Sequence, residues 1–543
     1  MGFSSIFQKS SVAKYAQGIK ETPRHIIFNG PLWFSSFLYA LSAIPLTWEQ
    51  GASAVIPSLP GFQKQFKVSS GADADAISNY LSIIYIGYAM GAALSFFAND
   101  SIGRRWAYRA YILLFIVGQI ICIFAPNMGT LYGARIITGM GIGSLSVIGP
   151  MSIAEISPKE IRGLLTSWYT VCQGIALTTA NFCVLGIIKH IPNSKVQYQI
   201  PSAAVSGFMF LCILASFFIT ESPRWLLMVG RREEAVATMA KLRQLPRDHE
   251  RIIGELADME ASIVAAHGDF GGKPSLWVVA KETFTVGSNL RRLQQVAMCY
   301  ALAQLSGANS VTSYFIPIMK LLGHSTDTQY SIFLSSMHAF SKLWFSLIAS
   351  FFFIDIVGRR RSLFIGIAFQ TISHIYIAVF IKYQQQGQTN AASGQAAIAA
   401  LFVHAFGYAV GLFILPYVFG GELWPDRIRS FGGAVGQTFH WLFIFAIKQS
   451  LPSLLHNTNN WGAFLFFAGW CVIGLIYIYL MVPEIAGLSV EEVDKIFEGS
   501  WLNAIKVTRA HRAQTRAFDT MDGVEDAGSE TGKRSDNIIS IKV

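Results

Sequence analysis

Residues 100–105 read DSIGRR, and the same Asp-x-x-Gly-Arg-Arg pattern returns as DIVGRR at residues 355–360. A second pattern, Glu-x-x-Pro-x-x-x-Arg, occurs as EISPKEIR at 155–162 and as ELWPDRIR at 422–429. Internal repeats indicate that a chain is built from duplicated structural units. Because the two patterns recur in the same order, the sequence predicts two halves with corresponding loops.

The sequence around these loops is unusually apolar. Of the 543 residues, 52% are hydrophobic and only 14% are charged, and the mean hydropathy is +0.43, whereas soluble domains carry roughly 25% charged residues. Runs of about 20 apolar residues, long enough to span a bilayer, predict an all-α integral membrane protein of twelve transmembrane helices. The expected spans are 32–56, 77–98, 106–125, 129–152, 164–188, 202–220, 293–317, 331–354, 363–382, 396–419, 430–450 and 461–482.

The order of spans and polar segments predicts the organisation of the chain. The repeated patterns follow spans two and eight and spans four and ten, so two pseudo-symmetric six-helix halves are expected. With both termini in the cytoplasm, about 33 of the 42 Lys and Arg residues fall on the cytoplasmic side, as the positive-inside rule requires. The expected segments are a cytoplasmic N-terminus (1–30), a first half (31–220), a helical cytoplasmic linker (221–292), a second half (293–483) and a cytoplasmic tail (484–543).

Several classes of function have no support in the sequence. The six cysteines lie in apolar runs without CxxC or Cys/His spacing, which indicates neither disulfides nor a metal site. The net charge of +10 accompanies no basic domain with interleaved aromatic residues, so no nucleic-acid partner is expected. No nucleophile triad or nucleotide motif is present, and we therefore expect neither an enzyme nor a cofactor, and no required oligomer.

Eight short motifs carry a family resemblance that covers almost the whole membrane region. They are NDSIGRR (99–105), RIITGMGIG (135–143), EISPKEIRG (155–163), ESPRWL (221–226), QLSGAN (304–309), DIVGRR (355–360), ELWPDRIRS (422–430) and PEIAGLSVEE (483–492). With these motifs the chain resembles the sugar porter family of the major facilitator superfamily. The resemblance implies a carrier fold with the substrate site near the bilayer midplane, between the halves.

The substrate-binding set expected from this resemblance departs from the glucose pattern. Where the family has a pair of glutamines in helix 7, the first is Ala303, and the Asn-Trp pair of helix 11 is His440-Trp441. Polyol recognition needs neutral donors, acceptors and an aromatic face, although amides in a bilayer also serve as links between helices. The predicted neutral and aromatic site residues are Gln173, Gln304, Asn309, Tyr314, Tyr417, His440 and Trp441.

Three ionisable residues lie inside expected spans, where a charge is costly and is a functional-site hypothesis by default: Glu49, Arg135 and Lys342. In proton-coupled sugar porters the acid that matches Glu49 pairs with the arginine that matches Arg135. The resemblance therefore implies that this pair couples transport to a proton. The alternative is a structural ion pair at the rim of the membrane.

Lys342 is expected several helical turns away from the cytoplasmic loop at 355–360, beyond the reach of a lysine that extends to the membrane surface. A lysine at this depth resembles fungal quinate and galacturonate-type permeases and suits a carboxylate-bearing substrate. The alternative is a lysine that points to the extracellular headgroups.

Charged residues of the repeated loops and of the ESPRWL motif are expected to form a cytoplasmic gate, because bidentate bonds between Arg and carboxylate can hold helix ends together and then break. A positive-inside anchor is the alternative. The gating residues predicted are Asp100, Arg104, Arg105, Glu155, Arg162, Glu221, Arg224, Asp355, Arg359, Arg360, Glu422 and Arg429.

Together these features predict proton-coupled uptake of a monosaccharide or a sugar-derived acid, similar to quinate or galacturonate, across a fungal cell membrane. The expected partners are therefore a small-molecule substrate, the lipid bilayer and a coupling proton. The sequence leaves open a facilitative uniporter, a metabolite exporter, or a nutrient sensor that signals through its tail.

Overall fold

The computed structural model describes residues 11–68, 73–267, 276–323, 328–353, 356–425, 427–484 and 496–497, and in this part of the chain every regular element is a helix. The first half contains α2 (Ser11–Glu21), α3 (Arg24–Ile27), α4 (Gly30–Ala40), η1 (Leu41–Ala43), α5 (Ile44–Val55), η2 (Ile56–Ser58), α6 (Pro60–Phe66), α7 (Ala74–Ser82), α8 (Ile84–Ile102), α9 (Arg104–Phe124), α10 (Met128–Ile156), α11 (Arg162–His190), α12 (Val196–Ala215) and η3 (Ser216–Phe218). The linker contains α13 (Pro223–Met228), α14 (Arg232–Arg243), α15 (Glu250–His267) and α16 (Leu276–Thr285). The second half contains α17 (Gly287–Leu305), α18 (Ala308–Ser313), α19 (Phe315–Leu321), α20 (Thr328–Ile348), η4 (Ala349–Phe353), α22 (Arg359–Gln385), α23 (Ala391–Tyr408), η5 (Ala409–Phe413), α24 (Leu415–Glu422), α25 (Arg429–Asn457) and α26 (Trp461–Met481).

Within the described residues, ten helices are long and apolar enough to cross a membrane. The expected spans 293–317 and 430–450 are the two that fall outside this group. The first is divided among α17, α18 and α19, because Gly307 has a φ of 76° that a helix cannot continue through. The second lies within α25, whose hydropathy is lowered by inward polar residues such as His440 and Lys448.

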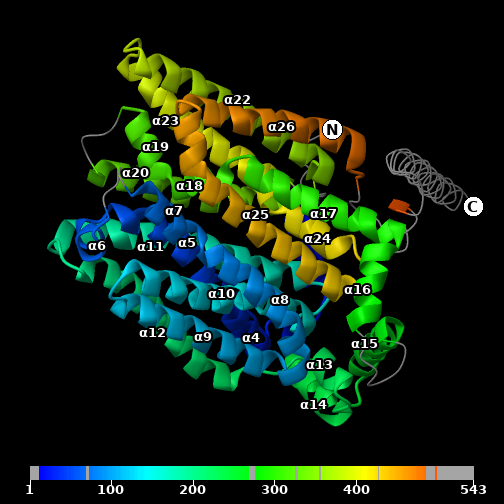
Figure 1. Ribbon diagram of the computed structural model, residues 1–543. Helices are drawn as coiled ribbons and strands as arrows, with labels where there is room; N and C mark the ends of the chain where they lie inside the picture. Colours follow the sequence, from blue (N-terminus) through cyan, green and yellow to red (C-terminus); the bar gives the residue numbers. More distant parts are fainter. Residues whose placement is uncertain are drawn as a thin grey trace, which may run out of the picture.

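The two halves lie side by side along their length, with α13–α16 gathered at one end (Figure 1). Small residues bring helices close within each half. A Cβ on Gly91 of α8 would lie 2.1 Å from the carbonyl oxygen of Met140 in α10. A Cβ on Gly366 of α22 would lie 2.4 Å from the carbonyl oxygen of Gly407 in α23. These positions exclude any larger side chain without helix displacement.

Hydrogen bonds join the two halves at the end opposite α13–α16. Ser82 donates to the Gln449 side chain at 2.5 Å, and Gln449 donates to Asn79 at 2.8 Å. Ser335 of α20 donates to Asn181 of α11 at 3.2 Å. These bonds hold the two halves together at this end, which is the extracellular one in the topology predicted from the sequence.

The linker packs as a small helical unit of its own. Its two longer helices, α14 and α15, cover the amphipathic segments expected there, and Met239 and Leu256 are buried between them. Arg243 donates to Glu255 at 2.8 Å and to the carbonyl oxygen of Ile156 at the end of α10. The linker is therefore fastened to the first half by a buried guanidinium.

Candidate functional site

A cavity of about 60 Å³ lies between the two halves, near the middle of the long helices. This volume holds several water molecules at about 10–15 Å³ each. Helices α5 and α11 contribute one wall, and α18, α20, η5, α24 and α25 contribute the other. Its polar lining comes from Thr47, Gln50, Thr170, Gln173, Asn309, Lys342, Ser346, Tyr417 and His440, and apolar side chains such as Leu46, Leu177 and Ile444 complete it. Apolar walls with a few convergent polar groups are typical of small-molecule sites.

Lys342 supplies a positive charge to this cavity. Its Nζ donates to the Thr312 hydroxyl at 3.0 Å and lies 5.4 Å from the ring centroid of Tyr408. Among the described residues no carboxylate lies within 4 Å of this ammonium group. The cavity can therefore offer a cation to an anionic ligand.

An aromatic cluster forms another part of the wall. The hydroxyl of Tyr417 shares a hydrogen bond of 3.0 Å with Nε2 of His440, and the rings of His440 and Trp441 are 4.6 Å apart. Nδ1 of His440 and Nε1 of Trp441 are buried and have no hydrogen-bond partner. Because buried polar atoms are almost always paired, these two nitrogens are available to a ligand.

A second, smaller cavity contains the Glu49–Arg135 ion pair. Nη1 of Arg135 lies 2.6 Å from Glu49, whose carboxylate also accepts hydrogen bonds from Ser53 at 2.8 Å and Gln119 at 2.5 Å. The Glu49 and Arg135 side chains are only 7% and 4% exposed. Gln50, the residue after Glu49, lines both cavities. A movement of α5 that separates the pair would therefore also change the wall of the larger cavity.

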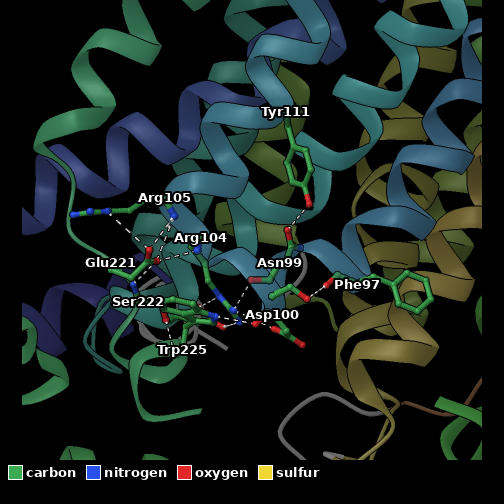
Figure 2. Close-up of polar contacts among 11 residues, drawn as sticks. Phe97, Asn99, Asp100, Arg104, Arg105, Tyr111, Glu221, Ser222 and Trp225 are labelled. Carbon is green, nitrogen blue, oxygen red and sulfur yellow. Dashed lines mark hydrogen bonds and ion pairs between the residues drawn. The ribbon is translucent and has the colours of Figure 1, made fainter. Parts of the chain in front are cut away.

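The repeated loop of the first half forms a dense network around Arg104 (Figure 2). Its guanidinium binds Glu155 through two bonds of 2.8 and 2.9 Å and binds Asp100 at 3.1 Å. Glu221 accepts from the backbone N–H of Arg104 at 2.9 Å and of Arg105 at 3.3 Å (Figure 2). Burial raises the pKa of the Glu221 carboxyl above its ordinary value, although these N–H groups oppose the shift. Glu221 thus caps the first turn of α9, where a negative charge is favoured.

The second half repeats this arrangement with a different acid. Glu484 accepts from the backbone N–H of Arg359 at 3.2 Å and of Arg360 at 3.1 Å, at the start of α22. Gly103 and Gly358, which precede the two helices, have φ values of 84° and 94°. A Cβ at either glycine would lie 2.9 Å from the capping carboxylate. The glycine of each repeat is therefore required both by its backbone angle and by the approach of the acid.

The model of the family described as "Sugar (and other) transporter" matches residues 36–497. The chain belongs to this family. It is 27% identical over 489 residues to a probable quinate permease of Aspergillus flavus, with 88% of this chain and 90% of that one covered. It is 26% identical over 523 residues to a quinate permease of Emericella nidulans, with 94% and 97% covered.

Solved structures confirm the fold of this sugar transporter. One is the proton:xylose symporter XylE of the major facilitator superfamily bound to 6-bromo-6-deoxy-D-glucose, with a TM-score of 0.70 at 19% identity over 86% of this chain and 99% of that one. Another is XylE from E. coli in a partially occluded inward-open conformation, with a TM-score of 0.67 at 18% identity over 83% and 100%. These structures confirm the predicted major facilitator fold, and the family match with the ten apolar helices confirms a multi-pass membrane transporter. The family and the named relatives are transporters and not enzymes.

Most of the predicted substrate-binding residues of the transporter meet in one place. Six of them line the larger cavity: Gln173, Asn309, Lys342, Tyr417, His440 and Trp441. Gln304 and Tyr314 do not line the cavity in this conformation, and their assignment to the site stays a prediction. Gln304 lies in α17 before the break at Gly307, and its Oε1 accepts a hydrogen bond of 2.6 Å from Asn309, which does line the cavity. The Tyr314 hydroxyl instead donates to the backbone of Lys448 at 3.3 Å.

The predicted gating residues are only partly assembled in this conformation of the transporter. The ion pairs described for Arg104 and Arg105 stay within the first half and the linker. Among the described residues, Arg162 and Arg224 have no carboxylate within 4 Å, and Arg429 donates to the carbonyl oxygen of Trp424. Asp355 and the side chain of Glu422 lie outside the described part of the chain, as does most of the predicted tail.

Two functional candidates were missed in the sequence. Lys448 lies inside the expected span 430–450 and was detectable by the rule that singled out Lys342, since both are lysines within apolar runs. Glu484 belongs to the motif at 483–492, but its pairing with the loop at 355–360 joins distant segments and has no local signal.

Proposed function

We propose that this sugar transporter is a secondary active importer of a carboxylate-bearing polyol, such as a cyclic sugar-derived acid, driven by a proton gradient across the cell membrane. The observation that carries the proposal is Lys342, a cation without a described carboxylate partner in a cavity that otherwise offers amides, hydroxyls and aromatic faces. The names of the quinate permeases among its relatives are consistent with an acid substrate.

Different residues would bind the carboxylate and the polyol part of the substrate. Its carboxylate would pair with Lys342, because a charge-assisted hydrogen bond in a site of low dielectric is stronger than a neutral one. Its hydroxyl groups would bind Gln173 and Asn309, and its C–H face would pack on Trp441. The unpartnered nitrogens of His440 and Trp441 would gain acceptors on the substrate.

Coupling to a proton would act through the Glu49–Arg135 pair. Protonation of Glu49 removes the negative charge that faces Arg135 and weakens the link between α5 and α10. Because Thr47 and Gln50 of α5 line the substrate cavity, the same movement changes the site. Alternating access then follows from rocking of the halves about this central region. The excess of Lys and Arg in the expected cytoplasmic segments supports cytoplasmic termini.

The test is uptake by cells or proteoliposomes of the matched pair D-galacturonate and D-galactose, which differ only in a carboxylate at C6, together with quinate. We expect uptake of an acid in preference to galactose and loss of accumulation when a protonophore is added. Uptake of galactose alone would exclude the acid, and accumulation that survives the protonophore would exclude proton coupling. Outward flux against the imposed gradient would identify an exporter instead.

A further inference from the structure

Lys448 of α25 is a buried lysine that the proposed transport cycle does not yet use. Lys448 is 3% exposed. Its Nζ donates to the hydroxyl of Tyr85 at 2.7 Å and lies 4.4 Å from the Tyr85 ring centroid. No carboxylate lies within 4 Å of this ammonium group among the described residues. A phenol and an aromatic face are its only described partners.

The charged groups that face Lys448 do not neutralise it. Glu49 and Arg135 line the same small cavity, but their charges cancel each other in a short ion pair. The Glu49 carboxylate is also occupied by Ser53 and Gln119. The other polar groups of this cavity are Gln50, Tyr85, Tyr88 and Ser313, none of which is an acid of ordinary carboxylate strength. A charged lysine that is buried without a counter-ion is unfavourable, so the arrival of an anion would stabilise its charged form.

Lys448 lies between the smaller cavity and the end at which hydrogen bonds join the two halves. Its backbone carbonyl oxygen accepts from Ser78 of α7 and from Tyr314, each at 3.3 Å. Ser78 belongs to the first half, and Tyr314 follows the break in α17–α19. The residue therefore stands where the halves meet, while Lys342 lies in the adjoining cavity and Gln50 borders both.

We propose that Lys448 is a second cationic contact for the anionic group of the substrate, reached from the smaller cavity that adjoins the substrate cavity at Gln50, and that it determines selectivity for acids over neutral polyols. This inference rests on the proposed function, since it needs a substrate with a carboxylate. The carboxylate binds the Nζ that Tyr85 now holds, and it passes between Lys448 and Lys342 along Gln50. Two cations at different depths then stabilise the acid over more of its path than one cation does.

The test compares the KM for galacturonate and for galactose in the full-length transporter and in Lys448→Met and Lys448→Arg. For Lys448→Met we expect the KM for galacturonate to rise at least tenfold and that for galactose to change less than about twofold. Lys448→Arg keeps the charge and should retain galacturonate uptake within about threefold. Tyr88→Phe, which alters another tyrosine of the same cavity, is the matched control and should leave the ratio of the two KM values unchanged.

The outcomes separate this inference from the function on which it rests. Wild-type protein that takes up galactose but no acid overturns both. Wild-type protein that takes up acid, with Lys448→Met raising both KM values equally or neither, overturns only the role of Lys448, because a purely structural lysine does not distinguish the substrates. If Lys448→Met is not folded, as judged by size-exclusion chromatography, Tyr85→Phe provides the second test, because its ring has no hydroxyl to compete with the carboxylate for the Lys448 Nζ. A lower KM for galacturonate with an unchanged KM for galactose in Tyr85→Phe supports the inference, and an unchanged ratio of the two KM values overturns it.

Discussion

The substitution Glu49→Gln isolates the charge of Glu49 from its shape. In the native protein its carboxylate accepts from Arg135 at 2.6 Å, Ser53 at 2.8 Å and Gln119 at 2.5 Å. A glutamine keeps one oxygen for Arg135 and presents an amide group toward Gln119, whose Oε1 is buried without a partner. Gln119 can therefore rotate its amide and accept the new donor. Most hydrogen bonds are then preserved, and the lost quantity is the negative charge.

The loss of folding stability in Glu49→Gln follows from the burial of the Glu49–Arg135 pair. Breaking a buried ion pair from one side costs about 3–5 kcal/mol, and the conserved hydrogen bonds place Glu49→Gln near the lower limit, about 3 kcal/mol less stable. We expect Glu49→Gln to lose proton-driven accumulation of substrate but to keep substrate exchange. A pH gradient of one unit contributes about 1.4 kcal/mol per coupled proton, which allows up to about tenfold accumulation. Glu49→Gln should reduce the accumulation ratio to about one, while exchange of labelled for unlabelled substrate continues.

The assay uses purified protein in proteoliposomes with an imposed pH gradient, and thermal unfolding is measured on the same samples. Glu260→Gln is the matched control, because Glu260 pairs with the exposed Arg232 on the linker and not in the membrane. It should leave accumulation unchanged. Accumulation by Glu49→Gln equal to that of the wild type would refute the assignment of Glu49 as the proton site, and loss of exchange as well would point to a structural ion pair.

Three further predictions concern the cavity, helix packing and the linker. Asn309→Ala should raise the substrate KM in an uptake assay about tenfold, because a hydrogen bond to the substrate is lost. Gln304→Ala should raise the KM less, because Gln304 does not line the cavity. Equal effects of the two substitutions would contradict the placement of Asn309 inside the cavity and Gln304 outside it. Gly91→Val should prevent close packing of α8 on α10 and abolish the monodisperse size-exclusion peak, and Gly433→Ala, with open space around its Cβ, should retain it. Burial alone would raise the pKa of the Glu255 carboxyl, but Arg243 and Arg251 lower it overall. The contribution of Glu255 to linker stability should therefore be fully present above its unfolded pKa of about 4.3. It should be lost as the pH falls through the lower pKa of the folded state. Hydrogen exchange of α14 and α15 against pH measures this loss, and Glu255→Gln should remove the dependence.

Sequence patterning alone predicted the architecture, because hydrophobic span length and loop motifs are local properties of the chain. Twelve apolar runs and two repeated patterns gave the six-plus-six arrangement, and the described helices fall at all twelve expected spans. The helices of the linker were also predictable, since their amphipathic periodicity needs no tertiary information. Glu49, Arg135 and Lys342 were found by the same local rule, that a charge inside an apolar run requires a reason.

Only the tertiary structure decided which of these side chains share a cavity. The rotation of each helix determines that Asn309 faces the cavity while Gln304 and Tyr314 do not. Likewise, the pairing of Glu484 with the start of α22, and the lack of a described carboxylate beside Lys448, depend on the packing of segments far apart in the chain. A sequence specifies where a charge is placed along a helix, but its partners are fixed by the neighbouring helices that pack against it.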